Sequence, residues 1–305
     1  MDIAEVDPAL REATTKLPAP DPSKALTRVF ARVATRVMPV PKVDGVNVRT
    51  ETYDGVRLRV YRPARRRSTG GVFWIHGGGL VLGDARQDEA LCAGTAAELG
   101  VTVVSANYRF APEHPFPAPF DDVAAAWGAT LNHAAELDLD IDHIAVGGES
   151  AGGGLAASLV QRLKDEGGVQ PVAQWLFAPM IDDRTAANEA LDSVDHWIWN
   201  NRANRYAWNG YLGGRVGAAT LPDYAAASRR VDLSGLAPAF ITYGDIELFA
   251  DEARTYADRL SNAGVAVTVD VVRGAPHGFE NWARTTEPAR ALLDRARQWL
   301  RAEIG

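Results

Sequence analysis

The chain has very little cysteine, no surplus of positive charge and no long apolar run free of polar residues. Its one cysteine, Cys92, excludes an internal disulfide and fits a reducing compartment. We expect Cys92 to be a small buried hydrophobe within a helical stretch. The formal net charge of −7 excludes the basic footprint that nucleic-acid-binding proteins carry.

Signals for secretion and for membrane insertion are also missing from the pattern. The first residues are acidic and contain no continuous apolar segment of the kind that a signal peptide needs. The longest weakly charged run, residues 143–161, is interrupted by glycine and polar residues, which excludes a membrane span. We therefore expect a soluble, cytoplasmic protein that has neither a membrane nor a nucleic acid as its partner.

What the sequence does contain is a regular alternation of strand-like and helix-like segments. Strand-like runs lie at residues 46–52, 56–62, 71–76, 101–108, 143–147, 174–179, 238–243 and 267–272. Helical patterns lie at about residues 86–99, 119–135, 151–166, 251–263 and 286–303. Because this alternation requires crossover connections, we expect one α/β domain over residues 1–305, with a mainly parallel sheet flanked by helices. The polar pair near residues 46–62 suits an antiparallel edge.

Two segments break this rhythm, about residues 1–45 and 183–224, and we expect them to form a helical cap. The first contains a helix whose apolar stripe we expect to pack on the protein's own body, with a membrane-surface helix as the alternative. The second is polar and aromatic, and its aromatics either pack internally or wall an apolar pocket, or do both. The stripe of the first segment consists of Leu26, Val29, Phe30, Val33, Ala34 and Val37, opposite Arg28, Arg32 and Arg36.

Two glycine-rich motifs carry the chemistry of this sequence. Gly148-Glu-Ser-Ala-Gly152 follows a strand-like run and opens a helical stretch, which is the context of a nucleophile elbow that presents Ser150. His76-Gly-Gly-Gly79 follows an earlier strand and can aim backbone N–H groups at a developing oxyanion. Each motif alone is a weak signal, but their order and context together predict acyl transfer.

A serine nucleophile needs a general base, which in this type of fold follows it in the chain. Only His196 and His277 come after Ser150. His277 lies in a loop between the last predicted strand and the final helix, whereas His196 lies in the predicted cap. We therefore expect His277 to be the base.

The base in turn needs an orienting carboxylate, and four candidates follow the strand predicted at residues 238–243. Asp251 and Glu252 open a helix, where acidic residues complement the N-terminal dipole, so capping explains them. Asp245 and Glu247 remain, and spacing alone does not separate them.

These motifs make the chain similar to the hormone-sensitive-lipase-like family of α/β-hydrolase esterases over roughly residues 45–303. In that family an acidic residue is followed, after three positions, by an acidic pair. Glu247 fits this pattern and Asp245 does not, so the resemblance favours Glu247 as the acid. The chain departs from the family at Glu149, where aspartate is usual, and at Phe110, where leucine is commoner. The matching segments are His76–Gly79, Tyr108–Ala118, Gly148–Gly153 and Ala275–Phe279.

The combined prediction is a carboxylesterase that needs no cofactor and no metal. Ser150 attacks the ester carbonyl, His277 accepts its proton and Glu247 orients the imidazole. We expect short acyl chains, and the resemblance suggests homodimers. The same residues would also suit an amidase or an acyltransferase, and a receptor without catalysis could use the same scaffold. We expect the oxyanion hole to comprise Gly77, Gly78, Gly79 and Ala151, with Gly77 shaping the loop.

Three neighbouring residues receive supporting roles. We expect His76 to pin the glycine loop rather than to react. The resemblance implies that Arg109 and Glu113 support the site from outside, and the alternative is that they form a surface ion pair.

Overall fold

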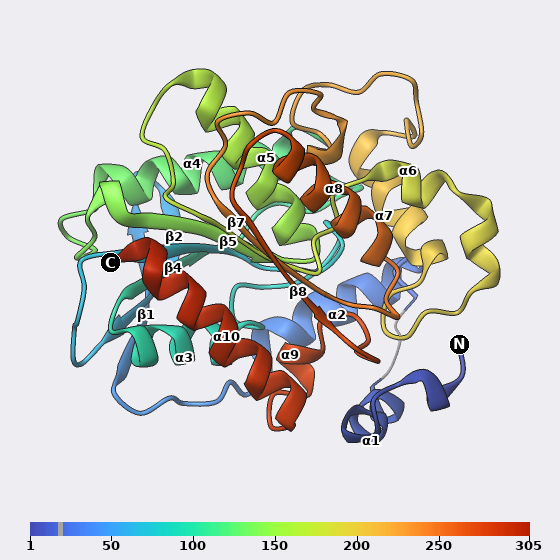
Figure 1. Cartoon of the computed structure of the whole chain (residues 1–305), viewed down its shortest axis with the longest axis horizontal. Coiled ribbons are helices and arrows are strands. Elements are labelled where there is room, and N and C mark those ends of the chain that lie inside the picture. The colour runs from blue at the N-terminus through green and yellow to red at the C-terminus, as the bar shows by residue number, and fades with distance from the viewer. Residues whose placement is uncertain (18–20) are drawn as a thin grey trace.

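An eight-stranded sheet runs through the middle of the molecule (Figure 1), in the spatial order β1-β2-β4-β3-β5-β6-β7-β8. The structure is a computed structural model that describes residues 1–17 and 21–305, so the part of the predicted cap at residues 18–20 lies outside the described residues. The strands are β1 (Val46–Tyr53), β2 (Val56–Pro63), β3 (Gly71–Ile75), β4 (Thr102–Ala106), β5 (Ile144–Glu149), β6 (Gln174–Phe177), β7 (Ala239–Gly244) and β8 (Val267–Val272).

The direction of the strands confirms the predicted fold class. β2 pairs antiparallel with both β1 and β4, and every neighbouring pair from β4 through β3 to β8 is parallel. Every residue of β3, β4 and β5 is buried, which explains why these strands are apolar without alternation. The parallel strands end at one edge of the sheet, and the loops after β5, β7 and β8 therefore meet there.

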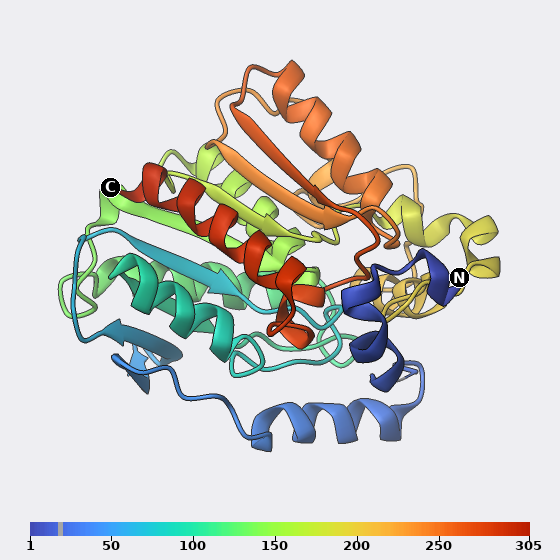
Figure 2. The same ribbon diagram turned by 60° about the horizontal axis from the view of Figure 1, so that its bottom comes forward.

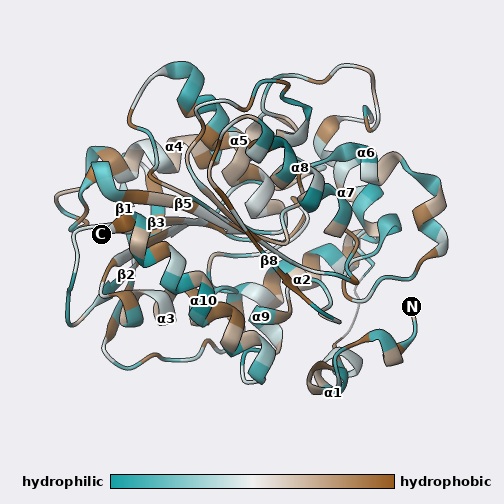
Figure 3. Cartoon of the chain, in the orientation of Figure 1, coloured by the Kyte–Doolittle hydropathy of each residue, from teal (hydrophilic) through white to brown (hydrophobic). Residues whose placement is uncertain are grey.

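Helices cover both faces of the sheet, as Figures 1 and 2 show. α4 (Ala118–Asn132), α5 (Ala151–Glu166) and α8 (Ala250–Asn262) pack on one face, and α1 (Pro8–Lys16), α3 (Glu89–Leu99) and α10 (Glu287–Ile304) pack on the other. The outward side of α8 is polar (Figure 3). The remaining elements are α2 (Ala25–Val37), α6 (Asp183–Ala187), α7 (Asn201–Leu212), α9 (Phe279–Trp282) and the 3-10 turns η1 (Ile3–Glu5), η2 (Ile141–His143), η3 (Glu189–Ser193) and η4 (Ala227–Arg229).

The structure bears on two further expectations, the burial of Cys92 and the lack of a membrane span. Cys92 lies on α3 and is fully buried, as expected, and burial raises the pKa of its thiol well above the usual range. Among the helices of residues 1–17 and 21–305, none combines the length and the apolar character needed to cross a membrane.

The orientation of α2 contradicts the prediction that its apolar stripe packs on the protein. Leu26 is 85% exposed and Phe30 is 76% exposed, whereas Arg28 is buried. Arg32 donates to the backbone carbonyl of Val81 at 2.8 Å and to that of Ala111 at 3.2 Å. The helix is held by guanidinium hydrogen bonds with fixed geometry, and these select the arginine face over the apolar one.

The segment at residues 183–224 folds as α6, η3 and α7 and lies beside the N-terminus (Figure 2). The N-terminal amine donates to the backbone carbonyl of Asp195 at 3.2 Å, and the Arg28 guanidinium lies 5.2 Å from the centre of the Tyr206 ring. The aromatic residues of α7 pack on one another, with the rings of Trp208 and Tyr211 5.9 Å apart. The predicted internal packing is therefore present for these two residues.

Candidate active site

The turn between β5 and α5 places Ser150 in a conformation that few residues adopt. Its φ is 55° and its ψ is −121°, and its side chain is almost entirely buried. Gly152 allows this turn to pass close to β3, because a Cβ there would lie 2.0 Å from the carbonyl oxygen of Ile75. The Ser150 N–H donates to the carbonyl of Phe177 on β6 at 2.8 Å. The strained elbow is thus held by strands on both sides.

A chain of polar contacts leads from this serine into the protein. The Oγ of Ser150 lies 2.9 Å from Nε2 of His277, which is carried by the loop after β8. Nδ1 of His277 contacts Oε2 of Glu247, and the other Glu247 oxygen accepts from the Gly244 N–H at 3.3 Å. Phe249 packs its ring edge-on against the imidazole, with 5.2 Å between ring centres. Apolar packing and these contacts leave the imidazole one orientation.

The structure separates the two acid candidates by position. Asp245 does not reach the imidazole, and its carboxylate accepts from the Gly274 N–H at 2.6 Å, at the start of the loop that carries His277. Asp245 therefore braces that loop, whereas Glu247 contacts the ring itself. His196 lines a pocket of about 610 Å³ whose lining includes Glu247 but, among the described residues, neither Ser150 nor His277.

Asp251 and Glu252 lie in the first turn of α8, as expected, but the hydrogen bonds of Glu252 go to another element. Its buried carboxylate accepts from the backbone N–H groups of Ile181 and Asp182, at 2.7 and 3.2 Å, and ties α8 to the loop after β6. Burial raises the pKa of Glu252 well above its usual range. Asp251 is exposed and pairs with Arg254, and no side chain caps the start of α8.

The glycine loop after β3 lies against the elbow. Gly78 has a φ of 116°, and a Cβ there would come within 2.0 Å of the carbonyl oxygen of Leu82, so only glycine fits. Throughout residues 1–17 and 21–305, the N–H groups of Gly78 and Gly79 donate to no protein acceptor. Ala151 is the first residue of α5, where an N–H has no partner within the helix. These three donors are free to bind an anionic oxygen.

The neighbours of the loop hold it in place. His76 is buried, its Nδ1 lies 2.7 Å from the carbonyl oxygen of Gly77, and its ring stacks on Tyr108 with centres 4.5 Å apart. The Tyr108 hydroxyl donates to the carbonyl of His76 at 3.0 Å. Burial lowers the pKa of His76 to about 4, so the ring stays neutral at physiological pH. This geometry fits the expected pinning role.

Arg109 and Glu113, which the resemblance placed in support of the site with a surface ion pair as the alternative, are each about half exposed and each form an ion pair with another residue. Arg109 forms a bidentate pair with Asp122 at 2.8 Å, and Glu113 binds Arg32 at 2.8 Å. The two residues therefore bind different helices. The partner of Arg109, Asp122, lies on α4, and the partner of Glu113, Arg32, lies on α2.

Three buried carboxyl groups lie beneath the elbow, and the sequence reading did not predict this cluster. Asn281 on α9 donates to Asp88 at 3.1 Å and also to Glu149, and Trp74 donates to Asp88 at 2.7 Å. Burial raises the pKa of Asp88 and of Glu280 to about 7, and that of Glu149 well above the usual range. The one signal in the sequence was the departure from the family pattern at Glu149.

Aromatic residues from the segment 183–224 approach the site. The indole of Trp199 packs on Gly79, because a Cβ at that glycine would lie 2.3 Å from the ring. Ile198 holds a φ of 73° in a tight turn closed by a hydrogen bond from the Trp199 N–H to the Trp197 carbonyl, at 2.9 Å. A β-branched residue in this conformation is strained, on the order of 1–3 kcal/mol. The strained turn directly precedes Trp199, the residue that packs on the glycine loop.

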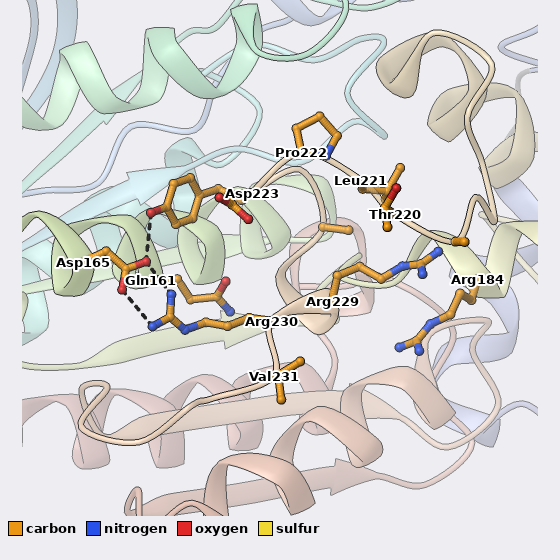
Figure 4. Close-up of a pocket in the computed structure, with 13 residues that line it drawn as sticks. Gln161, Asp165, Arg184, Thr220, Leu221, Pro222, Asp223, Arg229, Arg230 and Val231 are labelled. Atoms are coloured by element: carbon orange, nitrogen blue, oxygen red, sulfur yellow. Dashed lines mark hydrogen bonds and ion pairs between the residues drawn. The ribbon is translucent and has the colours of Figure 1, made fainter.

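A separate pocket of about 490 Å³ is lined by α5 and by residues 219–231 rather than by the serine (Figure 4). Its guanidinium groups are neutralised by neighbouring carboxylates, so we assign it no role in the chemistry. These ion pairs are Arg184 with Asp182, Arg229 with Asp183, and Arg230 with Asp165.

Comparison with known proteins gives consistent relatives. The family model described as the alpha/beta hydrolase fold matches residues 72–281. The chain is 34% identical over 274 residues to Carboxylic ester hydrolase LipN of Mycobacterium tuberculosis, covering 86% of this chain and 72% of LipN. It is 35% identical to Carboxylesterase NlhH of the same organism, covering 78% of this chain and 76% of NlhH.

Solved structures agree with these relatives. The structure named Bacterial Heroin Esterase superimposes with a TM-score of 0.89 at 34% identity, covering 99% of both chains. An esterase from the bacterial hormone-sensitive lipase family superimposes with a TM-score of 0.81 at 27% identity, covering 98% of this chain and 99% of that one.

Proposed function

Because the chain belongs to the hormone-sensitive-lipase-like family of α/β-hydrolase esterases, we propose that Ser150, His277 and Glu247 are the catalytic triad of a carboxylic ester hydrolase. The carboxylic ester hydrolase activity follows from this membership. The observation that supports the residue assignment is the continuous contact from the Ser150 hydroxyl through His277 to Glu247, beside unoccupied backbone donors. No cofactor is required for this chemistry.

The reaction follows from the geometry in two halves. The serine Oγ attacks the ester carbonyl while His277 Nε2 takes its proton, and Glu247 stabilises the imidazolium. The oxyanion binds the N–H groups of Gly78, Gly79 and Ala151, and the loss of one such donor typically costs about 3 kcal/mol. His277 then protonates the leaving alcohol, and water cleaves the acyl-enzyme by the reverse sequence of proton transfers.

The finer features of the function form part of the same proposal. Residues 1–45 and 183–224 act as the cap, supported by the contacts of the N-terminus and of Arg28 with the second segment. Short acyl esters are the substrates, supported by the packing of Trp199 on Gly79, which narrows the space beside the oxyanion. The cytoplasmic location and the homodimer rest on composition and on the family resemblance.

The test compares Glu247→Ala with Asp245→Ala on p-nitrophenyl esters of increasing acyl length. We expect Glu247→Ala to lower kcat by about a thousandfold or more, because the imidazole loses its orienting partner. Asp245→Ala, whose carboxylate accepts from the Gly274 N–H instead of contacting the imidazole, is the matched control and should lose far less. Circular dichroism establishes that each variant is folded. The reverse order of effects would move the acid to Asp245, and a folded wild type without activity on any ester would refute the function.

A further inference from the structure

A small cavity lies beside the elbow, between α5 and α7. Its volume is about 10 Å³, which is room for about one water-sized group. Ala151 and Leu155 line it from α5, and Leu80 lines it from the end of the oxyanion loop. Trp208 and Tyr211 close it from α7. The cavity therefore touches the oxyanion hole on one side and the segment 183–224 on the other.

The two aromatic residues carry polar atoms that no described residue satisfies. Trp208 is 2% exposed and Tyr211 is 1% exposed. Within the part of the chain that the structure describes, neither the Trp208 indole N–H nor the Tyr211 hydroxyl has a hydrogen-bond partner. A buried donor without an acceptor costs free energy, so such groups in native proteins are usually matched by a ligand or an ordered water. Both residues that carry these groups line the same cavity.

The position of the cavity identifies the part of an ester that would enter it. The leaving alcohol must lie next to His277, because that residue donates the proton to it. The described residues that line the cavity include none from the loop that carries His277, and they do include Ala151, a proposed oxyanion donor. The cavity is therefore on the acyl side of the scissile carbonyl.

We propose that Trp208 and Tyr211 form an acyl site for short acids that carry a hydroxyl on the carbon next to the carbonyl, namely 2-hydroxy acids. This inference rests on the proposed function, because it names the acyl group that Ser150 accepts. An oxygen at that position is two bonds from the carbonyl carbon, and the cavity has room for a group of that size. The oxygen accepts from the indole N–H or from the tyrosine hydroxyl, which removes the cost of leaving them unpaired. An alkyl group in the same place would leave both donors unpaired, and sites of this type reject such analogues strongly.

Ethyl glycolate and ethyl propionate form the matched substrate pair, because they differ only in a hydroxyl for a methyl group. The measured quantity is the ratio of their kcat/KM values in one reaction mixture, divided by the ratio of their hydroxide-catalysed rates. This division removes the intrinsic reactivity of the glycolate carbonyl, and competition in one mixture removes differences in the amount of active enzyme. For the wild type we expect a corrected ratio of about 10 to 100 in favour of glycolate.

Tyr211→Phe removes only the hydroxyl, and Trp208→Phe removes the indole N–H. We expect at least one of them to lower the corrected ratio about tenfold, and the larger change identifies the principal donor. Tyr206→Phe is the control, since it lies on the same helix, is not part of the cavity and should leave the ratio unchanged.

The outcomes separate this inference from the proposed function. A wild type that hydrolyses both esters with a corrected ratio near one would overturn the acyl site and leave the esterase intact. A high ratio that neither variant changes would also overturn it, because the donors would then only hold a buried water. A folded wild type that hydrolyses neither ester, nor any p-nitrophenyl ester, would refute the function itself.

Discussion

Two buried regions of the molecule differ in how their polar atoms are hydrogen-bonded. They are the junction, which consists of Ser150, His277 and Glu247, and the wall, which consists of Trp208 and Tyr211 on α7. In the junction Ser150, His277 and Glu247 all have partners. In the wall, Trp208 and Tyr211 bury donors that have none among the described residues. A site whose groups satisfy one another is preorganised before substrate arrives, whereas unpaired donors are satisfied only by what enters. This contrast is the basis for our proposal that the first region carries out the chemistry and the second selects the substrate.

The largest expected effect is the removal of the nucleophile from the junction. Ser150→Ala should lower kcat/KM by about 10⁴ or more, because no group remains to form the acyl-enzyme. The thermal unfolding midpoint should stay close to that of the wild type, since the hydroxyl has a single side-chain partner. Titration of the released acid measures kcat/KM, and thermal unfolding measures the midpoint. Retained turnover in the folded variant would remove Ser150 from the mechanism.

The next effect concerns the donors that face the junction. Gly78→Ala should lower kcat by about a hundredfold or more, because its Cβ would collide with the Leu82 carbonyl and displace the donor loop. Gly168→Ala is a control with open space around it. If the aromatic wall of α7, rather than the glycine loop, determined the rate, Gly78→Ala would change KM and leave kcat unchanged. Steady-state kinetics distinguish these two results.

A third prediction uses the acid cluster beneath the junction. Burial raises the pKa of Glu280 to about 7 from its ordinary 4.5, so the folded protein keeps a proton that the unfolded chain releases. The stability that this proton provides is complete below about pH 4.5 and is lost as pH rises towards about 7. Glu280→Gln stays neutral, so it should gain on the order of 2 kcal/mol over the wild type between pH 5 and pH 8.

Chemical denaturation at both pH values measures this gain. Glu287→Gln, at the exposed start of α10, is the control and should show no pH-dependent gain. An equal effect of Glu280→Gln at pH 5 and pH 8 would mean that the buried carboxyl does not titrate between them.

The smallest effect tests the comparison most directly, with one hydroxyl from each region. Tyr108→Phe removes a buried hydroxyl that donates to the His76 carbonyl, and it should cost about 1–2 kcal/mol of unfolding free energy. Tyr211→Phe removes a buried hydroxyl that has no partner in residues 1–17 and 21–305, and it should cost nothing or stabilise slightly. Denaturant unfolding measures both. Equal costs would mean that the wall is satisfied by water in the free protein.

Much of the fold was readable from local patterns, because each pattern had a local cause. The helix predicted at residues 151–166 coincides with α5, since the motif before it fixes where the elbow turns. All eight strands appear close to their predicted bounds, and the central ones, β3 to β7, are buried throughout, which is why they are apolar without alternation. Contacts between segments that are far apart in the sequence could not be predicted from such patterns. The stripe of α2 faces outward because Arg32 finds carbonyls 49 and 79 residues along the chain, and no local pattern records those partners.

The same division applies to the site. The family, the elbow at Ser150 and the glycine loop could be predicted from local motifs, because the turns that they form require glycine and serine at those positions. Spacing left Glu247 and Asp245 open and the resemblance favoured Glu247, but the contact of Glu247 rather than Asp245 with His277 is visible only in the folded chain. The same holds for α7, whose Trp208 and Tyr211 bury donors that have no partner among the described residues. Whether a buried polar atom has a hydrogen-bond partner depends on neighbours that folding brings together, and a local sequence pattern does not contain these neighbours.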